Sequence, residues 1–223
     1  MKRHIITTGD GSKTIQIDEW HEQYHSIHGA IQEANHVFLK SGFDAVISEL
    51  KLDAISILEI GFGTGLNAIM TLLKSEKDAV HVDYVGVEAY PVSVSEMKQL
   101  NYTELLEGEL TNKHFNTIHN VPWEEKTSIT NFFQLTKQNK KFQEITNSNQ
   151  FHLIYFDAFG ARVQPELWTE AIFKKMYHAL KVNGVLVTYS AKGSVRRALQ
   201  SVGFKVERLP GPPGKREMLR ATK

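Results

Sequence analysis

The strongest chemical signal in the chain is a glycine-rich turn at residues 58–67, which read LEIGFGTGLN. The turn follows an apolar run over 55–60 and precedes a helical pattern of apolar residues over 66–73. Glycines allow the backbone to bend tightly and to approach a ligand without a Cβ atom in the way. A dinucleotide site needs the spacing Gly-x-Gly-x-x-Gly, whereas position 66 is leucine. The turn therefore disfavours a nicotinamide dehydrogenase and favours the smaller ligand S-adenosylmethionine, with these candidate contacts: Glu59, Gly61, Gly63, Gly65 and Asn67.

Two acidic residues stand at the ends of further apolar runs. Glu88 closes the run over 82–88, where an acid can accept both ribose hydroxyls of the cofactor. Asp157 follows the apolar run over 151–156. Methyl transfer to nitrogen needs a neutral amine, and a carboxylate can orient an amine and take its proton. We therefore expect Asp157 to be the catalytic residue and to face both cofactor and substrate. The purely structural alternatives are a ligand-free glycine turn, a strand-closing glutamate and a loop-capping aspartate.

A parallel sheet would bring these residues together, because the carboxyl ends of its strands meet at one edge. Strands are predicted at 55–60, 82–88, 128–133, 151–156 and 185–189, and helices at 66–73, from about 91, 165–180 and 194–202. Two final strands at 204–209 and 217–221 have no helix between them, which predicts an antiparallel edge. The predicted fold class is α/β, a Rossmann-like, mostly parallel sheet with an antiparallel C-terminal edge, typical of class I S-adenosylmethionine-dependent methyltransferases.

A small N-terminal extension over 1–50 is expected to precede a methyltransferase domain over 51–223. Residues 1–17 predict a hairpin around the turn at 9–12, and 18–50 predict polar helix with a break near 41–42. His21, His25 and His28 have the i, i+4, i+7 spacing of one helix face. Because no clear carboxylate partner accompanies them, we predict no metal site.

Composition excludes several classes of protein. The 223 residues include no cysteine, so there is no disulfide, thiolate metal ligand or cysteine nucleophile. The N-terminus lacks the apolar run of a signal peptide, and no stretch approaches the ~18 apolar residues of a membrane helix. We expect a cytoplasmic protein that does not bind membranes.

The net charge of +1 conceals a basic C-terminal segment. Residues 190–223 contain nine lysines and arginines and only two glutamates. Such a segment indicates a polyanionic partner such as RNA, or else a solvated basic surface.

Several motifs together resemble the methyltransferase domain of the MnmC family. They lie at 24–30, 36–38, 59–67, 156–159, 165–168, 190–199, 203–204 and 213–218, so the likeness spans nearly the whole chain. The resemblance implies that S-adenosylmethionine methylates the aminomethyl group of 5-aminomethyl-(2-thio)uridine at the tRNA wobble position. By matching motif positions, Gly61, Gly63, Gly65 and Glu88 would bind the cofactor and Asp157 would lie at the reacting amine. Phosphates or the flipped-out nucleoside would meet four basic residues: Arg196, Arg197, Lys215 and Arg216.

The chain departs from the family pattern in two places. Members often have Gly-Asp after the third strand, where the acid meets the adenine amino group, but residues 132–136 read FFQLT. Many bacterial members are also fused to a flavin-dependent oxidase that prepares the aminomethyl substrate. We expect a standalone form, with a separate enzyme supplying the precursor.

Two other functions remain open at this point. One is a class I N-methyltransferase acting on a small-molecule or protein amine, which the turn and Asp157 would serve equally well. The other is a non-catalytic RNA-binding adaptor with a relic fold.

Overall fold

An eight-stranded sheet forms the centre of the protein in the computed structural model, which describes residues 2–106 and 111–223. Its strand order is β10-β11-β9-β8-β4-β5-β7-β6. The parallel strands are β4 (Ala54–Ile60), β5 (His81–Val87), β7 (Phe133–Gln138), β8 (Phe151–Phe156) and β9 (Leu180–Thr188). The antiparallel strands are β6 (Lys126–Ser128), β10 (Lys205–Pro210) and β11 (Glu217–Thr222). The predicted fold class, including its antiparallel C-terminal edge, is confirmed.

The direction of the strand order reverses between β4 and β8. From β4 the chain proceeds outward to β5 and β7 on one side, whereas β8 and β9 lie on the other. In open α/β sheets such a switch point leaves a crevice outside the carboxyl ends of the two strands. The glycine-rich turn follows β4 and Asp157 follows β8, so both predicted motifs meet at this crevice.

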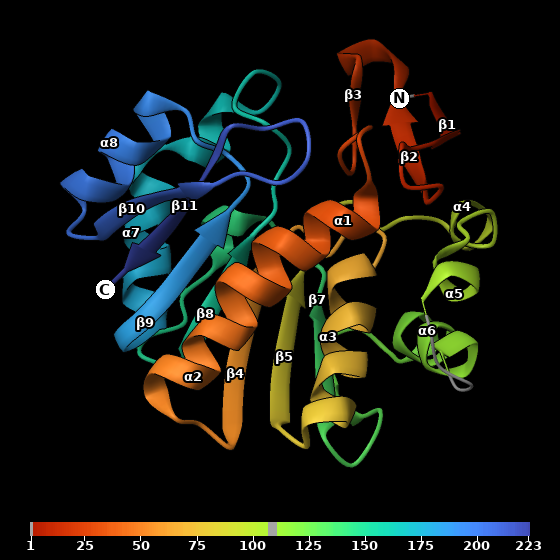
Figure 1. The fold of residues 1–223 in the computed structure, drawn as a ribbon, viewed down its shortest axis with the longest axis horizontal. Helices are drawn as coiled ribbons and strands as arrows, with labels where there is room; N and C mark the ends of the chain where they lie inside the picture. The colour runs from red at the N-terminus through yellow and green to blue at the C-terminus, as the bar shows by residue number, and fades with distance from the viewer. Residues whose placement is uncertain (1, 107–110) are drawn as a thin grey trace.

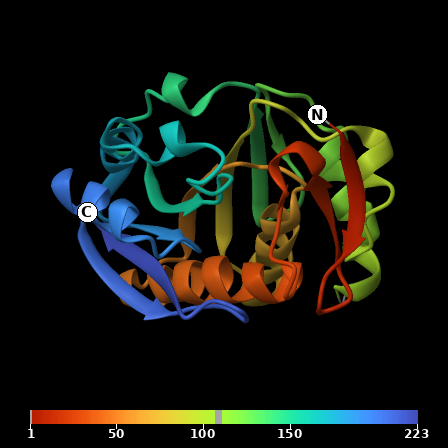
Figure 2. The same cartoon turned by 90° about the horizontal axis from the view of Figure 1, so that it is seen from above.

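Helices cover both faces of the sheet (Figures 1 and 2). One face carries a continuous helix made of α1 (Ala30–Ala34), the π-helical η2 (Asn35–Asp44) and α2 (Ala45–Leu50), with α3 (Leu66–Asp78) and α6 (Thr111–Asn120) beside it. The other face carries α7 (Glu170–Ala179) and α8 (Gly193–Ser201). The remaining helices are short: η1 (Asp18–Trp20), α4 (Val94–Met97), α5 (Tyr102–Leu105), η3 (Phe142–Glu144) and η4 (Pro165–Trp168). None of the described helices is long and apolar enough to cross a membrane.

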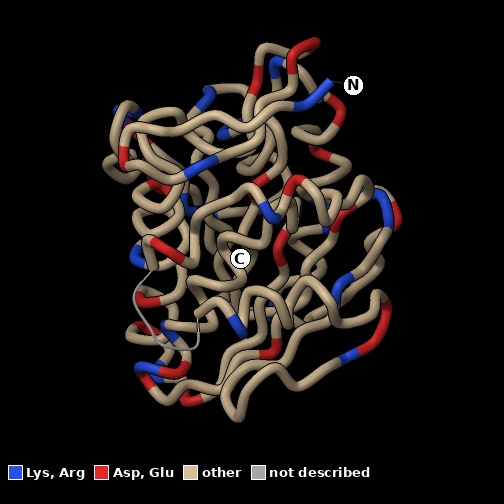
Figure 3. Tube along the Cα trace, turned by 90° about the vertical axis from the view of Figure 1, so that its right-hand side faces the viewer, with Lys and Arg blue, Asp and Glu red and all other residues tan. Residues whose placement is uncertain are grey.

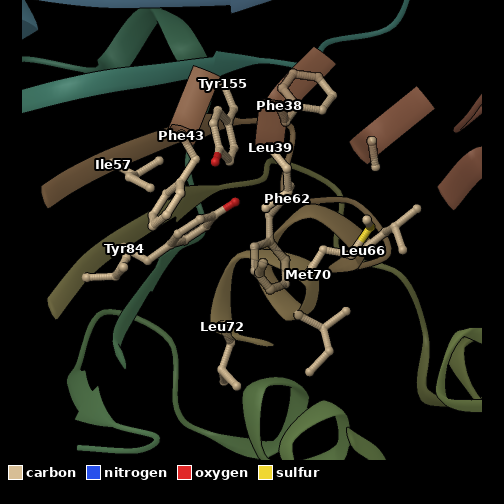
Figure 4. Close-up of a cluster of buried hydrophobic side chains, with 14 of the residues drawn as sticks. Phe38, Leu39, Phe43, Ile57, Phe62, Leu66, Met70, Leu72, Tyr84 and Tyr155 are labelled. Carbon is tan, nitrogen blue, oxygen red and sulfur yellow. The ribbon is translucent and has the colours of Figure 1, made fainter. Parts of the chain in front are cut away.

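Large aromatic side chains attach the long N-terminal helix to the sheet (Figure 4). Phe38 and Phe43 of η2 are fully buried, together with Tyr84 of β5 and Tyr155 of β8. The rings of Phe38 and Tyr155 lie 5.1 Å apart in a tilted arrangement. Because each such ring buries roughly 150–250 Å² on folding, this cluster contributes strongly to the core. The helix over 30–50 therefore packs into the same core as the sheet.

A small three-stranded sheet lies over the carboxyl ends of the central strands, at the top of Figure 1. It contains β1 (Arg3–Thr7), β2 (Lys13–Ile17) and β3 (Glu22–Gln23), all antiparallel, so the predicted hairpin is confirmed. The residues between β3 and α1 continue along the crevice.

The prediction of helix from residue 18, with a break at 41–42, is wrong. Residues 18–29 form η1, β3 and a loop, and the helix begins only at Ala30. The helix continues through Gly42 without a break. This glycine is buried and allows the helix to lie close to the sheet. A Cβ atom there would lie 3.1 Å from the side chain of Val187 and 3.3 Å from that of Tyr155. Glycine is a weak helix former, but this close packing overrides its preference.

Two other predicted elements are displaced. The third strand was placed at 128–133, whereas β7 spans Phe133–Gln138 and residues 129–132 form a turn. The helix expected from about residue 91 is only the four-residue α4. A capping box at Ser93 and Glu96 starts α4.

Candidate functional site

The turn after β4 and the loop after β8 touch at the centre of the crevice. Gly61 has φ of +89°, and a Cβ atom at this position would lie 2.7 Å from the carbonyl oxygen of Asp157. The Asp157 amide in turn donates a 2.9 Å hydrogen bond to the carbonyl of Ile60. Only glycine fits so close an approach at this backbone angle. The glycine therefore fixes the position of the acidic residue.

Glu88 holds the glycine-rich turn from the end of β5. One carboxylate oxygen accepts a 3.1 Å hydrogen bond from the amide of Gly63, and the other accepts a 2.8 Å bond from the amide of Tyr90. Gly65 has a left-handed conformation and is the N-cap residue immediately before α3. A buried turn, a helix N-terminus and an acid thus converge at the edge of the sheet.

A hydrogen-bonded chain links Asp157 to a second, deeper acid. The side-chain amide of Asn67 donates to Asp157 Oδ2 at 2.8 Å and to Glu59 Oε1 at 2.9 Å. Glu59 is fully buried, and burial raises its pKa well above the ordinary value. Glu59 does not line the crevice. It accepts a hydrogen bond from Asn67 and so helps to orient the amide that binds Asp157.

The carboxyl group of Asp157 has a raised pKa. Burial, and after it the nearby Glu33 carboxylate, raise the pKa of Asp157, whereas the Asn67 hydrogen bond and Lys215 lower it, and the net result is a pKa of about 7. A group with this pKa accepts and releases protons at the pH of a cell.

The crevice opens into a cavity of about 670 Å³. Its floor is the glycine-rich turn with Asn67, Glu88 and Asp157, and its walls come from the N-terminal extension and from the loops after β8 and β9. Cavities of roughly 300–1,000 Å³ are usual for cofactor sites.

Aromatic side chains line part of the cavity wall. The ring of Phe159, two residues after Asp157, packs edge-on against Trp20 at 5.4 Å and Tyr24 at 4.9 Å. Arg162 ties this wall together, since its guanidinium donates to the carbonyl of Trp20 and to the carboxylate of Glu22, both at 2.8 Å. The N-terminal extension thus supplies one side of the cavity.

The structure brings six of the eleven predicted site residues to the cavity: Gly61, Gly63, Asn67, Glu88, Asp157 and Lys215. Glu59 and Gly65 lie behind this lining. Arg196 and Arg197 lie outside the cavity on α8. Arg216 lines a shallow groove beside the cavity, together with Lys192 and Lys215.

The basic C-terminal segment is partly neutralised within the protein. Arg208 pairs with Glu217, Arg220 with Glu49 and Glu207, and Lys215 with Glu33. Basic and acidic residues are interspersed over the side of the molecule in Figure 3. Within the described part of the chain, the basic residues of this segment without an ion pair are Lys192, Arg196, Arg197, Lys205, Arg216 and Lys223.

The predicted helical alignment of histidines is wrong. His21 has a left-handed conformation that ends η1, and His25 and His28 lie in the loop before α1. Buried His25 shares a 2.9 Å hydrogen bond with Thr14 of β2, and burial lowers its pKa to about 4. It is a neutral structural residue that joins the small sheet to the cavity wall.

The stretch compared with the family's adenine-binding motif, residues 132–136, was taken from the wrong part of the third strand. Because β7 ends at Gln138, its carboxyl edge lies beyond residues 132–136. Asn139 follows and donates to the carbonyl of Glu88 at 3.1 Å, and the neighbouring cavity wall comes from residues 141–143.

Several cavity residues were missed: Trp20, Tyr24, Phe159, Arg162 and Tyr189. The family motifs at 24–30 and 156–159 contain two of them, so these motifs were the available signal. Periodicity alone cannot locate the others, because the contacts join distant segments.

The sequence pattern of the family described as S-adenosyl-L-methionine-dependent methyltransferase matches residues 102–223, more than half of the chain. The chain belongs to this family. The predicted cofactor, S-adenosylmethionine, is thereby confirmed. The glycine turn, the acid at the end of β5 and the adjoining cavity form a site that suits this ligand.

Relatives of the methyltransferase include longer proteins. The tRNA 5-methylaminomethyl-2-thiouridine biosynthesis bifunctional protein MnmC of Burkholderia mallei is 28% identical over 215 residues, which cover 88% of this chain and 32% of that protein. The protein of the same name from Leptospira interrogans is 27% identical over 222 residues, covering 96% and 34%. The methyltransferase thus spans about a third of the length of these relatives.

Solved structures agree with this family. MnmC2 from Aquifex aeolicus matches the methyltransferase with a TM-score of 0.81 and 26% identity, covering 99% of this chain and 70% of that one. The predicted resemblance to the MnmC methyltransferase domain is confirmed. Spermidine synthase from Thermotoga maritima, with a TM-score of 0.57 and 14% identity over 98% of this chain and 71% of its own, shares the fold.

Proposed function

We propose that this methyltransferase converts 5-aminomethyl-(2-thio)uridine to 5-methylaminomethyl-(2-thio)uridine at the wobble position of tRNA. The observation that carries the proposal is the contact between Gly61 and Asp157, which places a carboxylate of raised pKa beside the donor cradle. The names of the MnmC relatives and the free basic residues near the cavity support tRNA as the substrate.

The donor is assigned to the glycine-rich side of the cavity. Gly61, Gly63 and Gly65 shape the turn, Glu88 accepts the ribose hydroxyls, and Asn67 with Glu59 behind it supports this side. S-adenosylmethionine, when bound, supplies an electrophilic methyl group on its sulfonium.

Asp157 is assigned as the proton acceptor for the substrate amine. An alkylammonium has no lone pair and cannot attack, so a proton must leave before or during methyl transfer. The Asp157 carboxylate, with its pKa near 7, orients the amine and receives this proton. Asn67 keeps the carboxylate in place through its 2.8 Å hydrogen bond.

The tRNA is assigned to the side of the cavity formed by the C-terminal segment. Arg196 and Arg197 of α8, with Lys192 and Arg216 beside the shallow groove, are suited to phosphate contacts. A wobble nucleoside turned out of the anticodon loop would enter the cavity and stack on the aromatic wall of Trp20, Tyr24 and Phe159.

The substrate must already carry a primary amine, so a separate enzyme is proposed to supply the aminomethyl precursor. A tRNA-modifying role implies work in the cytoplasm, where tRNA is found.

A substrate competition assay tests the proposal. Wild-type protein receives donor labelled at the methyl group and one of three acceptors: aminomethyl-bearing tRNA, the same tRNA with unmodified wobble uridine, or a small primary amine. Label in the first tRNA alone is expected. Preferential labelling of the small amine would instead identify a methyltransferase for small-molecule or protein amines, and donor binding without any transfer would indicate a non-catalytic adaptor.

A further inference from the structure

Lys215 and Glu33 form an ion pair inside the cavity. The ammonium of Lys215 lies 2.5 Å from Glu33 Oε2, and the other carboxylate oxygen accepts a 3.1 Å hydrogen bond from the amide of Ser26. The Glu33 side chain is 8% exposed and that of Lys215 is 32% exposed. Both line the cavity that contains Asp157, so the pair joins α1 to the C-terminal turn across the substrate side of the site.

The turn between β10 and β11 holds Lys215 in a fixed position. Gly214 has φ of +81°, and a Cβ atom there would lie 2.0 Å from the His28 ring, so the turn packs directly on the cavity wall. The Lys215 ammonium also lies 3.9 Å from the centre of the Tyr189 ring. The Tyr189 hydroxyl donates to the carbonyl of Ala158, next to Asp157, at 2.8 Å. Lys215 is thereby oriented relative to the loop after β8 that contains Asp157.

This arrangement is unlike that of a phosphate contact. A lysine that binds phosphate contributes an unpaired, solvent-facing charge, whereas Glu33 neutralises Lys215 within the cavity. Lys215 and the next residue, Arg216, both border the outer groove, but only Lys215 also lines the cavity. Arg216 is exposed and has no ion pair among the described residues. An ammonium has three hydrogens, so the bond to Glu33 leaves donors for a ligand inside the cavity.

We propose that Lys215, held by Glu33 and Tyr189, donates a hydrogen bond to the ring carbonyl beside the aminomethyl-bearing carbon of the substrate nucleobase. The inference rests on the proposed function. In a uracil ring, the C4 carbonyl adjoins C5, so an amine at Asp157 carries this carbonyl with it into the same cavity. A lysine is a donor only and therefore selects an acceptor at this position. In this arrangement Lys215 recognises the base, whereas Arg216 contacts the tRNA phosphate backbone outside the cavity.

Three variants separate this role from its alternatives. The test variant combines Lys215→Met with Glu33→Gln, which replaces the ion pair by neutral groups of similar shape and leaves no buried unpaired carboxylate. Lys215→Met alone is the second variant, and Arg216→Met is the matched control on the neighbouring residue. For each, kcat/KM on aminomethyl-bearing tRNA is measured from about 50 to 300 mM salt, and donor affinity is measured by calorimetry.

The double variant is expected to lose about 10- to 100-fold in kcat/KM at every salt concentration, because a charged hydrogen bond to substrate is lost. Its salt dependence and donor affinity should match those of the wild type. Lys215→Met alone should lose at least as much, since it also leaves Glu33 unpaired. Arg216→Met should flatten the logarithmic salt dependence by about one unit.

Wild-type kcat/KM in the double variant would overturn the inference, because Lys215 would then only neutralise Glu33. A flattened salt dependence would assign Lys215 to a phosphate, and weakened donor binding would assign the pair to the donor site; either result would also overturn it. Failure of the wild type to methylate this tRNA would instead refute the proposed function, and is seen before any variant is compared.

Discussion

Replacing Gly61 by alanine tests the contact on which the site depends. The added Cβ atom would lie 2.7 Å from the Asp157 carbonyl oxygen, 0.7 Å inside the 3.4 Å at which ordinary contact begins. The backbone angle of +89° adds strain of about 1–3 kcal/mol for a residue with a side chain. Overpacking of a rigid site contributes about 1–3 kcal/mol more. The free energy of unfolding should therefore fall by roughly 2–6 kcal/mol.

Gly11→Ala is the matched control. Gly11 has a similar angle, φ of +83°, but lies in the hairpin turn with nothing within 4 Å of the added atom. It should therefore lose only the backbone part of the free energy, about 1–3 kcal/mol. The difference between the two variants isolates the contact with Asp157.

Urea unfolding measures the stability of each variant, and calorimetry measures its affinity for S-adenosylmethionine. Gly61→Ala should be less stable than Gly11→Ala by about 1–3 kcal/mol and should bind the donor more weakly, whereas Gly11→Ala should bind it as the wild type does. Equal stability and equal donor affinity in the two variants would refute the argument that this glycine sets the geometry of the site.

Five other predictions follow from the same structure. Asp157→Asn should reduce kcat at least about 100-fold and leave donor affinity from calorimetry within about twofold, since it removes the proton acceptor and retains the shape; unchanged turnover would exclude Asp157 from the chemistry. Because burial raises the pKa of Asp157 to about 7, the carboxylate is lost as pH falls through this value, so wild-type kcat/KM should decline below about pH 7. Asn67→Leu removes a hydrogen bond that lowers this pKa, so the midpoint of the pH–rate profile should move to higher pH; a midpoint that stays in place or moves down contradicts the assigned contact. Burial lowers the pKa of His25 to about 4, so between pH about 6.5 and 4 the unfolded chain binds a proton that the folded protein does not, and the free energy of unfolding should fall as the pH is lowered through this window. In urea titrations at several pH values, His25→Gln should show a smaller fall than the wild type. An equally steep fall would locate the acid sensitivity elsewhere. Arg197→Ala should weaken tRNA binding and lower the slope of log affinity against log salt concentration by about 0.9. Arg208→Ala removes an arginine already paired with Glu217 and should change this slope less. Equal slopes for the two variants would show that α8 does not contact tRNA.

The central strands could be predicted from sequence because their apolar residue patterns match the strands that they form. The strand predicted at 151–156 matches β8 at both ends, since the apolar run stops at the charged residue Asp157. The glycine-rich turn and Asp157 could be paired from sequence, because carboxyl ends of parallel strands share one edge. Their direct contact, through Gly61, depends on strand order and was visible only in three dimensions.

The displaced third strand has a specific physical cause. Lys137 falls near the end of β7 and looks like a loop residue, since lysine is rarely buried. In the fold it is 1% exposed. Its ammonium donates to the His119 carbonyl at 2.7 Å and lies 5.0 Å from the centre of the Trp123 ring. These partners come from another segment, so no local pattern could reveal them.

The cavity wall could not be predicted for a similar reason. Trp20 and Tyr24 precede the central sheet by thirty residues or more. In the loop after β8, the Phe159 ring packs against both of them, and Arg162 donates to the carbonyl of Trp20. Lys215 was grouped with Arg196, Arg197 and Arg216 because charge counting ignores pairing, and its partner Glu33 lies 182 positions away. Such contacts between distant parts of the chain turn the N-terminal extension into part of the site.

The most direct test of the central claim is mass analysis of the wobble nucleoside. Aminomethyl-bearing tRNA is incubated with donor and either wild-type protein or Asp157→Asn, digested to nucleosides and separated by chromatography. Wild-type protein should add one methyl group, located by fragmentation on the aminomethyl nitrogen, and Asp157→Asn should leave the nucleoside almost unchanged while still binding donor. A methyl group on the ring, the ribose or another nucleotide, or equal conversion by the variant, would contradict the account.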